Sequence, residues 1–375
     1  MRFSVLLVRG LLRRPVRSFL TASAMAIAVA AVVALVGIAY GFETSFMASF
    51  RTAGIDLVVI RAGQHDRLKS TLDGDLARPL AAIPGVLSVS PSLMELVSFE
   101  DQGLMAVGVR GVEPHSRVLD GMRVIAGRPL AEGDKRAVVL GDLVAQSLKL
   151  KVGNQLPLYG EPYEVVGIHH ADSSVDNGAI LVPLAQLQTA VGRPNQVTGF
   201  TLEAARPNEP GEIERMAAAV ERVAPMVAAL TTRDHVSSIA QIRAARNMAW
   251  VTSFIGLTVG AIGVLNTMFM SVYERRREIG VLRAVGWHKG RVVAMIVGES
   301  LLLSLAGAAA GSLVAVALTK LLSAMPAANG MIEGHVAWQA IGEGFALALA
   351  IALIGAAYPA YRSARLTPCD ALRAD

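Results

Sequence analysis

Cysteine, charge and aromatic side chains are all scarce in this sequence of 375 residues. Its single cysteine, Cys369, excludes an internal disulfide framework and a thiolate metal cluster, because both need several sulfur atoms. Charged residues make up 17%, against about a quarter in average soluble domains, while 53% of the residues are hydrophobic. Aromatic residues make up only 5%, which leaves few rings for stacking on bases, so nucleic acid is not an expected partner. This composition is typical of a chain that resides partly in a membrane.

The hydrophobic residues are gathered in four long stretches. A helix needs about 20 residues without charge to cross a hydrocarbon core of about 30 Å. The sequence therefore predicts an α-helical membrane protein with four transmembrane helices, over residues 19–42, 248–273, 291–320 and 341–361. The first follows a basic segment, as a secretory signal does, but its uncharged run of 24 residues exceeds the roughly 7–15 of a signal. We predict that it is retained as an anchor.

Positive charge is concentrated outside these helices, in three segments. Residues 1–18, 274–291 and 362–375 together hold 14 basic and 4 acidic residues, whereas residues 43–247 hold 20 basic and 23 acidic residues. Short basic loops stay on the cytoplasmic side of a membrane. We therefore predict that both termini and the 274–290 loop are cytoplasmic, in the inner membrane of a bacterium. Residues 43–247 and the short loop 321–340 are then extracytoplasmic.

The long segment 43–247 predicts a mixed α/β extracytoplasmic domain inserted between the first and second transmembrane helices. Short β-rich runs punctuated by Gly and Pro predict strands at 55–60, 104–112, 137–140, 163–168, 179–182 and 197–202. Residues 211–224 show the apolar spacing of an amphipathic helix. Two further helices are expected to link this domain to the membrane. One continues the first span through Phe46 and Phe50, and the other leads into the second span with Val236, Ile239, Ala240 and Ile242 on one side.

This domain contains little that predicts chemistry. His169, His170, Asp172 and Asp176 are metal-ligating residue types, but adjacent histidines on a strand point to opposite sides and cannot easily share one ion. A solvated loop is the favoured interpretation. The sequence has neither a Gly-x-Ser-x-Gly elbow nor a His-Glu-x-x-His motif. We therefore expect no catalytic residue and no metal site in this chain.

The most informative segment is the basic loop after the second span, ERRREIGVLRAVG at residues 274–286. Ile279, Leu282 and Val285 recur at three-residue spacing, which predicts a short helix with one apolar edge, and Gly286 is a natural terminator. Such a helix suits the docking of a soluble partner. The alternative is that the arginines at 275–277 anchor lipid phosphates. If the helix docks, its apolar edge and above all Leu282 should carry the affinity, whereas rim arginines such as Arg275 should contribute little.

This run resembles the signature of the MacB/FtsX-type permeases of ATP-binding-cassette (ABC) transporters, which reads Glu-Arg-x-Arg-Glu-Ile-Gly-(Ile/Val)-Leu-(Arg/Lys)-Ala-(Leu/Ile/Val)-Gly. The run PAYRSARLTPCDALR at 359–373 is similar to that family's closing motif, although Cys369 replaces an apolar or small residue. The run LLRRPVR at 11–17 resembles its basic entry to the first span. Residues 139–141, 152–153, 165–168 and 182–184 resemble its periplasmic core.

The resemblance implies a permease that dimerises, as a homodimer or a heterodimer, with each copy bound to one ABC ATPase subunit. The docking residues that it implies are Glu274, Arg277, Glu278, Ile279, Gly280, Leu282, Arg283, Val285 and Gly286. ATP and magnesium would be bound by the ATPase, and this chain would need no cofactor of its own. In agreement, the sequence has no Gly-x-x-x-x-Gly-Lys-[Ser/Thr] phosphate loop. The resemblance also admits a periplasmic adaptor and an outer-membrane channel as partners.

One charge and several glycines stand out within the predicted spans. Glu299 lies about 12 Å along its helix from Arg291, and because carboxylates inside a membrane are rare, a structural or coupling role is expected for it. Small-residue surfaces for close helix contact are provided by Gly256, Gly260, Gly307 and Gly311. Packing within one subunit and an interface between subunits are equally compatible with these glycines.

Two functions remain open at this point. The first is export or extraction of a hydrophobic compound, lipid, lipoprotein or peptide by mechanotransmission, in which ATP-driven dimerisation of the ATPases moves the external domains. The second is a signalling lever that activates a periplasmic hydrolase, as the cell-division members of the family do, but their external domain is generally much smaller than the 205 residues found here. An intramembrane enzyme is disfavoured, because no predicted span pairs a nucleophile with a histidine.

Overall fold

The computed structural model describes residues 15–64, 67–323 and 336–365. They divide into a helical unit, described over residues 15–40, 245–320 and 336–365, and an α/β unit, described over residues 41–64, 67–244 and 321–323. Most of the predicted N-terminal segment and tail, and much of the predicted 321–340 loop, lie outside the described residues.

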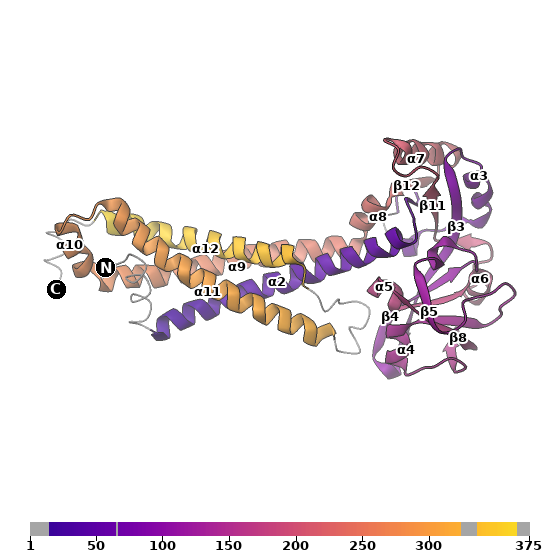
Figure 1. Ribbon diagram of the computed structural model, residues 1–375, viewed down its shortest axis with the longest axis horizontal. Coiled ribbons are helices and arrows are strands. Elements are labelled where there is room, and N and C mark those ends of the chain that lie inside the picture. Colours follow the sequence, from indigo (N-terminus) through magenta and orange to yellow (C-terminus); the bar gives the residue numbers. More distant parts are fainter. Residues whose placement is uncertain (1–14, 65–66, 324–335, 366–375) are drawn as a thin grey trace. The chain divides into compact units, whose positions relative to one another are not determined.

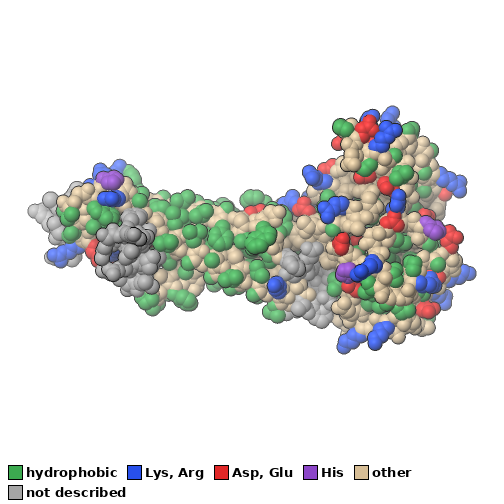
Figure 2. All heavy atoms as spheres, in the orientation of Figure 1, with side chains coloured by type: hydrophobic (Ala, Val, Ile, Leu, Met, Phe, Trp, Pro, Cys, Tyr) green, Lys and Arg blue, Asp and Glu red, His purple; other side chains and the backbone are tan. Residues whose placement is uncertain are grey.

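Four long helices dominate the helical unit and lie side by side (Figure 1). Each is long and apolar enough to cross a membrane, which confirms the predicted number of spans within the described residues. Figure 2 shows hydrophobic side chains over the visible face of these helices. The elements are α2 Pro15–Thr52, α9 Ala240–Glu274, the short α10 Arg276–Ala284, α11 Lys289–Ser323 and α12 Trp338–Ala364. As predicted, α2 continues through Phe46 and Phe50.

The helix that was expected to lead into the second span is interrupted. α8, Thr232–Ser238, ends at Ile239, whose φ of −59° and ψ of 123° are not helical, and α9 begins at the next residue. An extended residue breaks the ladder of hydrogen bonds from each N–H to the carbonyl four residues earlier. The prediction of one continuous helix from Val236 to Ile242 is therefore wrong.

Glycine sets the spacing between the helices of this unit. Gly307 and Gly311 of α11 lie against α2, where a Cβ added at Gly307 would be 2.6 Å from the Cβ of Met25. A Cβ added at Gly260 of α9 would be 2.8 Å from Ile351 of α12, and Gly256 faces α2 at ordinary contact distance. All four glycines therefore face helices of their own chain. This arrangement favours packing within one subunit over the subunit interface that the sequence left open.

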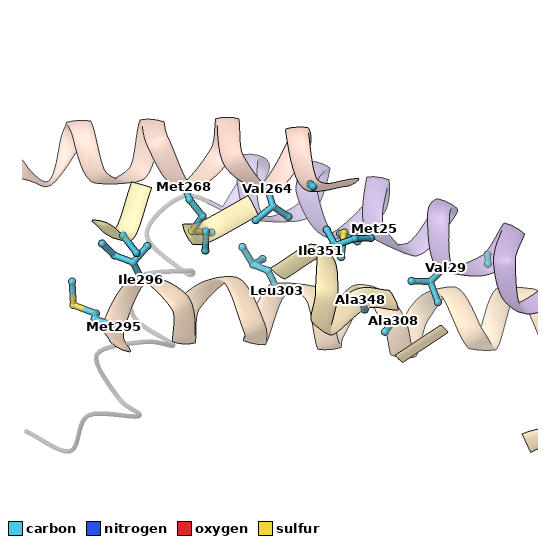
Figure 3. Packing of buried hydrophobic residues seen from close by; sticks show 14 of the residues in the cluster. Met25, Val29, Val264, Met268, Met295, Ile296, Leu303, Ala308, Ala348 and Ile351 are labelled. Carbon is cyan, nitrogen blue, oxygen red and sulfur yellow. The ribbon is translucent and has the colours of Figure 1, made fainter. Parts of the chain in front are cut away.

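The buried side chains of the helical unit form one large apolar cluster. Figure 3 shows Met25 of α2, Val264 of α9, Leu303 of α11 and Ile351 of α12 between the helices. Ile279 of α10 belongs to the same cluster. The short helix α10 is therefore packed onto the bundle by its own apolar residue, and its position is fixed relative to the long helices.

The α/β unit is built on one ten-stranded sheet with the order β12-β1-β11-β3-β4-β9-β6-β8-β5, and β7 pairs with β8. The pairs β4 with β9 and β6 with β8 are parallel, and the other pairs are antiparallel. The strands are β1 Leu57–Arg61, β3 Val86–Phe99, β4 Leu104–Val112, β5 Met122–Gly127, β6 Ala137–Gly141, β7 Gln155–Leu158, β8 Glu161–Ala171, β9 Ala179–Pro183, β11 Gly199–Ala204 and β12 Val227–Thr231. The short strands β2 Leu72–Asp73 and β10 Gln196–Val197 form a separate pair.

Helices cover this sheet and complete its apolar clusters. They are α3 Ala77–Ala81, α4 Asp142–Leu148, α5 Ser174–Asn177, α6 Leu184–Ala190 and α7 Glu212–Val223, with 3-10 turns η1 Arg67–Lys69, η2 Gly74–Leu76, η3 Glu100–Gln102 and η4 Arg117–Leu119. The predicted amphipathic helix is α7, whose Met216 and Val220 are buried against the sheet. The six predicted strand segments all fall on observed strands, and the mixed α/β fold class is confirmed.

The residues considered for a metal site take up structural positions instead. His169 of β8 is buried and its Nε2 donates to the backbone oxygen of Asp176 at 3.1 Å, while exposed His170 contacts Asp142 at 2.7 Å between Nδ1 and Oδ2. The carboxylate of Asp176 accepts from Arg110 of β4 at 3.4 Å, and both side chains are buried. Among the described residues no cluster of His, Cys, Asp or Glu could hold a metal ion.

Acidification is expected to destabilise the α/β unit through His169. Burial lowers the pKa of its imidazole below the ordinary value, so the folded state binds its proton less readily than the unfolded state does. His169 therefore contributes its full stability above pH about 6.5, and this contribution is lost as the pH falls below that value. The melting temperature of the unit should decline between pH 7 and pH 5, and His169→Gln should flatten the decline. An equally steep decline in the variant would contradict this assignment, and His170→Gln is the exposed control.

Candidate docking element at the end of the helical unit

The loop after the second span folds as predicted into a short helix, α10. The helix α9 ends at Glu274, and Arg275, with φ −107° and ψ 14°, turns the chain into α10. Gly286 ends the segment in the left-handed region, at φ 105°, where glycine is favoured over residues with a side chain. The N–H of Trp287 then donates to the carbonyl of Leu282 at 3.0 Å, which closes the end of the helix.

The predicted apolar edge of α10 is divided between two faces. Ile279 is buried in the bundle and Leu282 is half-buried, whereas Val285 is 79% exposed. The reason is geometric, because each step of three residues rotates about 60° around a helix with 3.6 residues per turn. Ile279 and Val285 are two such steps apart and cannot share a face. The prediction of one edge formed by Ile279, Leu282 and Val285 is therefore wrong.

The exposed apolar surface of α10 is formed instead by Val281 and Val285. Val281 is 48% exposed and lies four residues before Val285, so the two side chains are neighbours along the helix. Arg277, Glu278 and Ala284 are also exposed and flank this pair. Among the other proposed docking residues, Glu274 and Gly286 are also exposed. Gly280 is buried, and the Arg283 guanidinium donates to the Trp287 carbonyl at 3.1 Å. A partner would therefore meet two valines within a charged rim.

The start of α10 is held by an ion pair inside the bundle. The Arg275 guanidinium donates from Nη1 to Oε1 of Glu299 in α11 at 2.7 Å, and from Nε to Oε2 of Glu278 at 3.1 Å. The side chains of Arg275 and Glu299 are only 19% and 5% exposed. Arg275 is therefore not the solvent-screened rim residue that the sequence suggested. Glu299, for which a structural or coupling role was expected, connects α11 to the turn before α10 through this ion pair.

A second ion pair holds the end of α9. Arg17 of α2 donates from both terminal nitrogens to the two carboxylate oxygens of Glu274, each at 2.9 Å. Such a bidentate pair fixes orientation as well as distance. Glu274, named from the sequence as a docking residue, thus has a bond within its own chain. Sequence reasoning gave Arg17 no role in an ion pair and assigned Arg275 to the rim. It also missed Val281, which could have been found from its four-residue spacing from Val285.

Comparison with known proteins agrees with this architecture. Residues 18–223, more than half of the chain, match the model of the MacB-like periplasmic core domain, and residues 250–368 match that of the FtsX-like permease C-terminal region. The chain belongs to the MacB/FtsX-type family of ABC transporter permeases. It is a multi-pass membrane protein with four apolar helices and an α/β domain between the first and the second.

This chain matches different shares of its individual relatives. The macrolide export ATP-binding/permease protein MacB of Agrobacterium fabrum is 27% identical over 96% of this chain, which spans 58% of that relative. The uncharacterised ABC transporter permease YknZ of Bacillus subtilis is 24% identical, and the match covers 97% of this chain and 96% of YknZ. The crystal structure of the periplasmic region of MacB from Actinobacillus actinomycetemcomitans is also similar. The alignment covers 50% of this chain and 94% of the MacB region, at 14% identity and a TM-score of 0.39.

Proposed function

We propose that this permease is driven by a separate ATPase subunit that docks on α10 and that it acts by mechanotransmission. ATP binding and hydrolysis in two ATPase copies would move α10, and two permease copies would pass this movement to their α/β domains outside the cytoplasm. The work done would be export or extraction of a hydrophobic compound, lipid, lipoprotein or peptide. The macrolide export named for several relatives supports a hydrophobic cargo.

The exposed pair Val281 and Val285 on an otherwise anchored helix is the observation that carries this proposal. A docking helix must present an apolar surface to its partner and must also transmit force to the membrane helices. α10 meets the first condition with its two valines. It meets the second through buried Ile279 and through Arg275, whose partner Glu299 is in α11. The pair formed by Glu274 with Arg17 extends this connection to α2.

A separate source of ATPase activity is supported by the sequence itself. The chain carries no Gly-x-x-x-x-Gly-Lys-[Ser/Thr] loop to cradle the phosphates of a nucleotide. The positive charge of the 274–291 segment supports its placement in the cytoplasm, where ATP is available.

Reconstitution tests the proposal directly. The 375-residue chain in proteoliposomes should hydrolyse no ATP above the level of empty liposomes, and hydrolysis should appear when its cognate ATPase subunit is added. The control is the same ATPase without the lysine of its phosphate loop, which should bind the permease but remain inactive. Nucleotide-specific hydrolysis by the permease alone, or failure of the active ATPase to associate with it, would overturn the proposal.

A further inference from the structure

A second basic feature lies at the same end of the helical unit, between the ends of α9 and α12. It is a small notch with a free volume of about 10 Å³, enough for one water-sized group. Its walls include Phe269 and Tyr273 of α9, Arg276 at the start of α10, and Pro359, Arg362 and Ser363 of α12. None of these residues belongs to the exposed valine surface of α10.

Two guanidinium groups face this notch, each supported by an aromatic ring. The guanidinium carbon of Arg276 lies 4.3 Å from the ring centre of Tyr273, and that of Arg362 lies 5.5 Å from the ring centre of Phe269. The ring of Phe269 is in turn stacked on Tyr358, with 6.1 Å between centres and 4° between planes. Stacking on rings holds both cations in place while leaving their hydrogen-bond donors free for another group.

The charge of these two arginines is not compensated by the described part of the chain. There, Arg17 and Arg275 each have a carboxylate partner, but neither Arg276 nor Arg362 has one. Arg362 has only a weak bond, 3.4 Å long, to the hydroxyl of Tyr358. The Nε of Arg276 is buried and has no acceptor among the described residues. A buried donor on a cation without an acceptor is costly, so the geometry calls for an anion.

We propose that this notch binds the phosphate of an anionic phospholipid. Guanidinium groups bind phosphate through paired hydrogen bonds, and one phosphate oxygen fits the free volume beside the Arg276 Nε. Exposed Tyr273 and Tyr358 flank the notch at the ends of membrane-spanning helices, where tyrosine is enriched at the level of lipid headgroups. Basic pockets between such helices suit anionic headgroups. The inference does not rest on ATPase docking, because neither Arg276 nor Arg362 belongs to the exposed pair Val281 and Val285.

Lipid titration of the purified full chain in neutral detergent tests this site. Phosphatidylglycerol should bind saturably, measured by native mass spectrometry and by a rise in melting temperature, whereas phosphatidylcholine and inorganic phosphate should not match it. The variant Arg276→Gln/Arg362→Gln should bind phosphatidylglycerol about thirtyfold more weakly, from the loss of two arginines at a lipid surface. The matched control Lys289→Gln/Arg291→Gln removes two exposed charges from the start of α11 and should bind almost as the wild type does.

Each alternative outcome overturns the proposal in a different way. An equal loss in the control would mean that only the overall charge attracts lipid. Equal binding of inorganic phosphate would identify a soluble anion as the occupant, and unchanged binding in the notch variant would place the lipid elsewhere. If the double variant does not fold, Arg362→Gln alone should still weaken binding about fivefold. A single variant with wild-type affinity would then refute the site.

Discussion

Replacing Arg275 with alanine is expected to destabilise the helical unit by about 3 to 5 kcal/mol, the usual effect of removing one partner from a buried ion pair. The change leaves Glu299, whose side chain is 5% exposed, without its counter-charge inside the bundle. It also removes the bond from Arg275 to Glu278 at the start of α10. Unfolding in mixed micelles with increasing dodecyl sulfate would measure the loss of free energy.

A double-mutant cycle separates the ion pair from the arginine alone. Arg275→Met combined with Glu299→Leu replaces both charges by apolar side chains of similar length, so it should cost much less than the sum of the single changes. Arg277→Ala is the matched control, because Arg277 is exposed on α10 and its loss should change stability by less than about 1 kcal/mol. If Arg275→Ala is no more harmful than Arg277→Ala, the ion pair does not stabilise the bundle.

Val285→Asp is expected to abolish binding of the ATPase while leaving the permease folded. Val285 is 79% exposed and contributes nothing to the apolar cluster of the bundle, so a carboxylate there meets water in the free permease. In the complex the same carboxylate would be buried without a partner. Anchor residues of interfaces contribute about 2 kcal/mol or more, so affinity should fall at least about thirtyfold. Val281→Asp should act in the same way, and co-purification with a tagged ATPase measures both.

The controls for this experiment use neighbouring positions. His288→Asp introduces the same group three residues later, at an exposed position just before α11 where aspartate is a favourable helix cap, and should leave binding intact. Ile279→Asp should reduce the yield of folded permease, because Ile279 is buried in the bundle. Full affinity in both valine variants would show that α10 does not dock by this surface, and loss with Arg276 and Arg277 replaced instead would favour lipid anchoring.

The elements that could be predicted from the sequence are those specified by local patterns. Uncharged runs of sufficient length specify the four long helices, and β-branched runs such as LVVI in β1 specify strands. The strand β3 was missed because Pro91 lies in its middle, although in the sheet Pro91 is in register with Phe200 of β11. β5 was missed because most of its residues are exposed and show no clear alternation.

The candidate site was predictable as a segment but not as a surface. A three-residue spacing indicates that α10 is helical, but only packing against the bundle decides that Ile279 faces inward and Val281 outward. The ion pairs were beyond local reasoning for the same reason. Arg17 and Glu274 are separated by 257 positions, and Arg275 and Glu299 by 24. No sequence pattern specifies which of the several arginines in the loop will meet a buried carboxylate.

The placement of β1 between β11 and β12 has a consequence for folding during synthesis on the ribosome. Leu57 is in register with Leu202 and with Thr231, the last of which follows it by 174 residues. At roughly 5–20 residues per second, a ribosome needs roughly 10 to 35 s to make that stretch. For most of this time the apolar strand LVVIR has neither of its sheet neighbours, and an unpaired strand invites aggregation. The unit must therefore complete its sheet after nearly all of it has been synthesised, and until then the unpaired strand needs protection from aggregation.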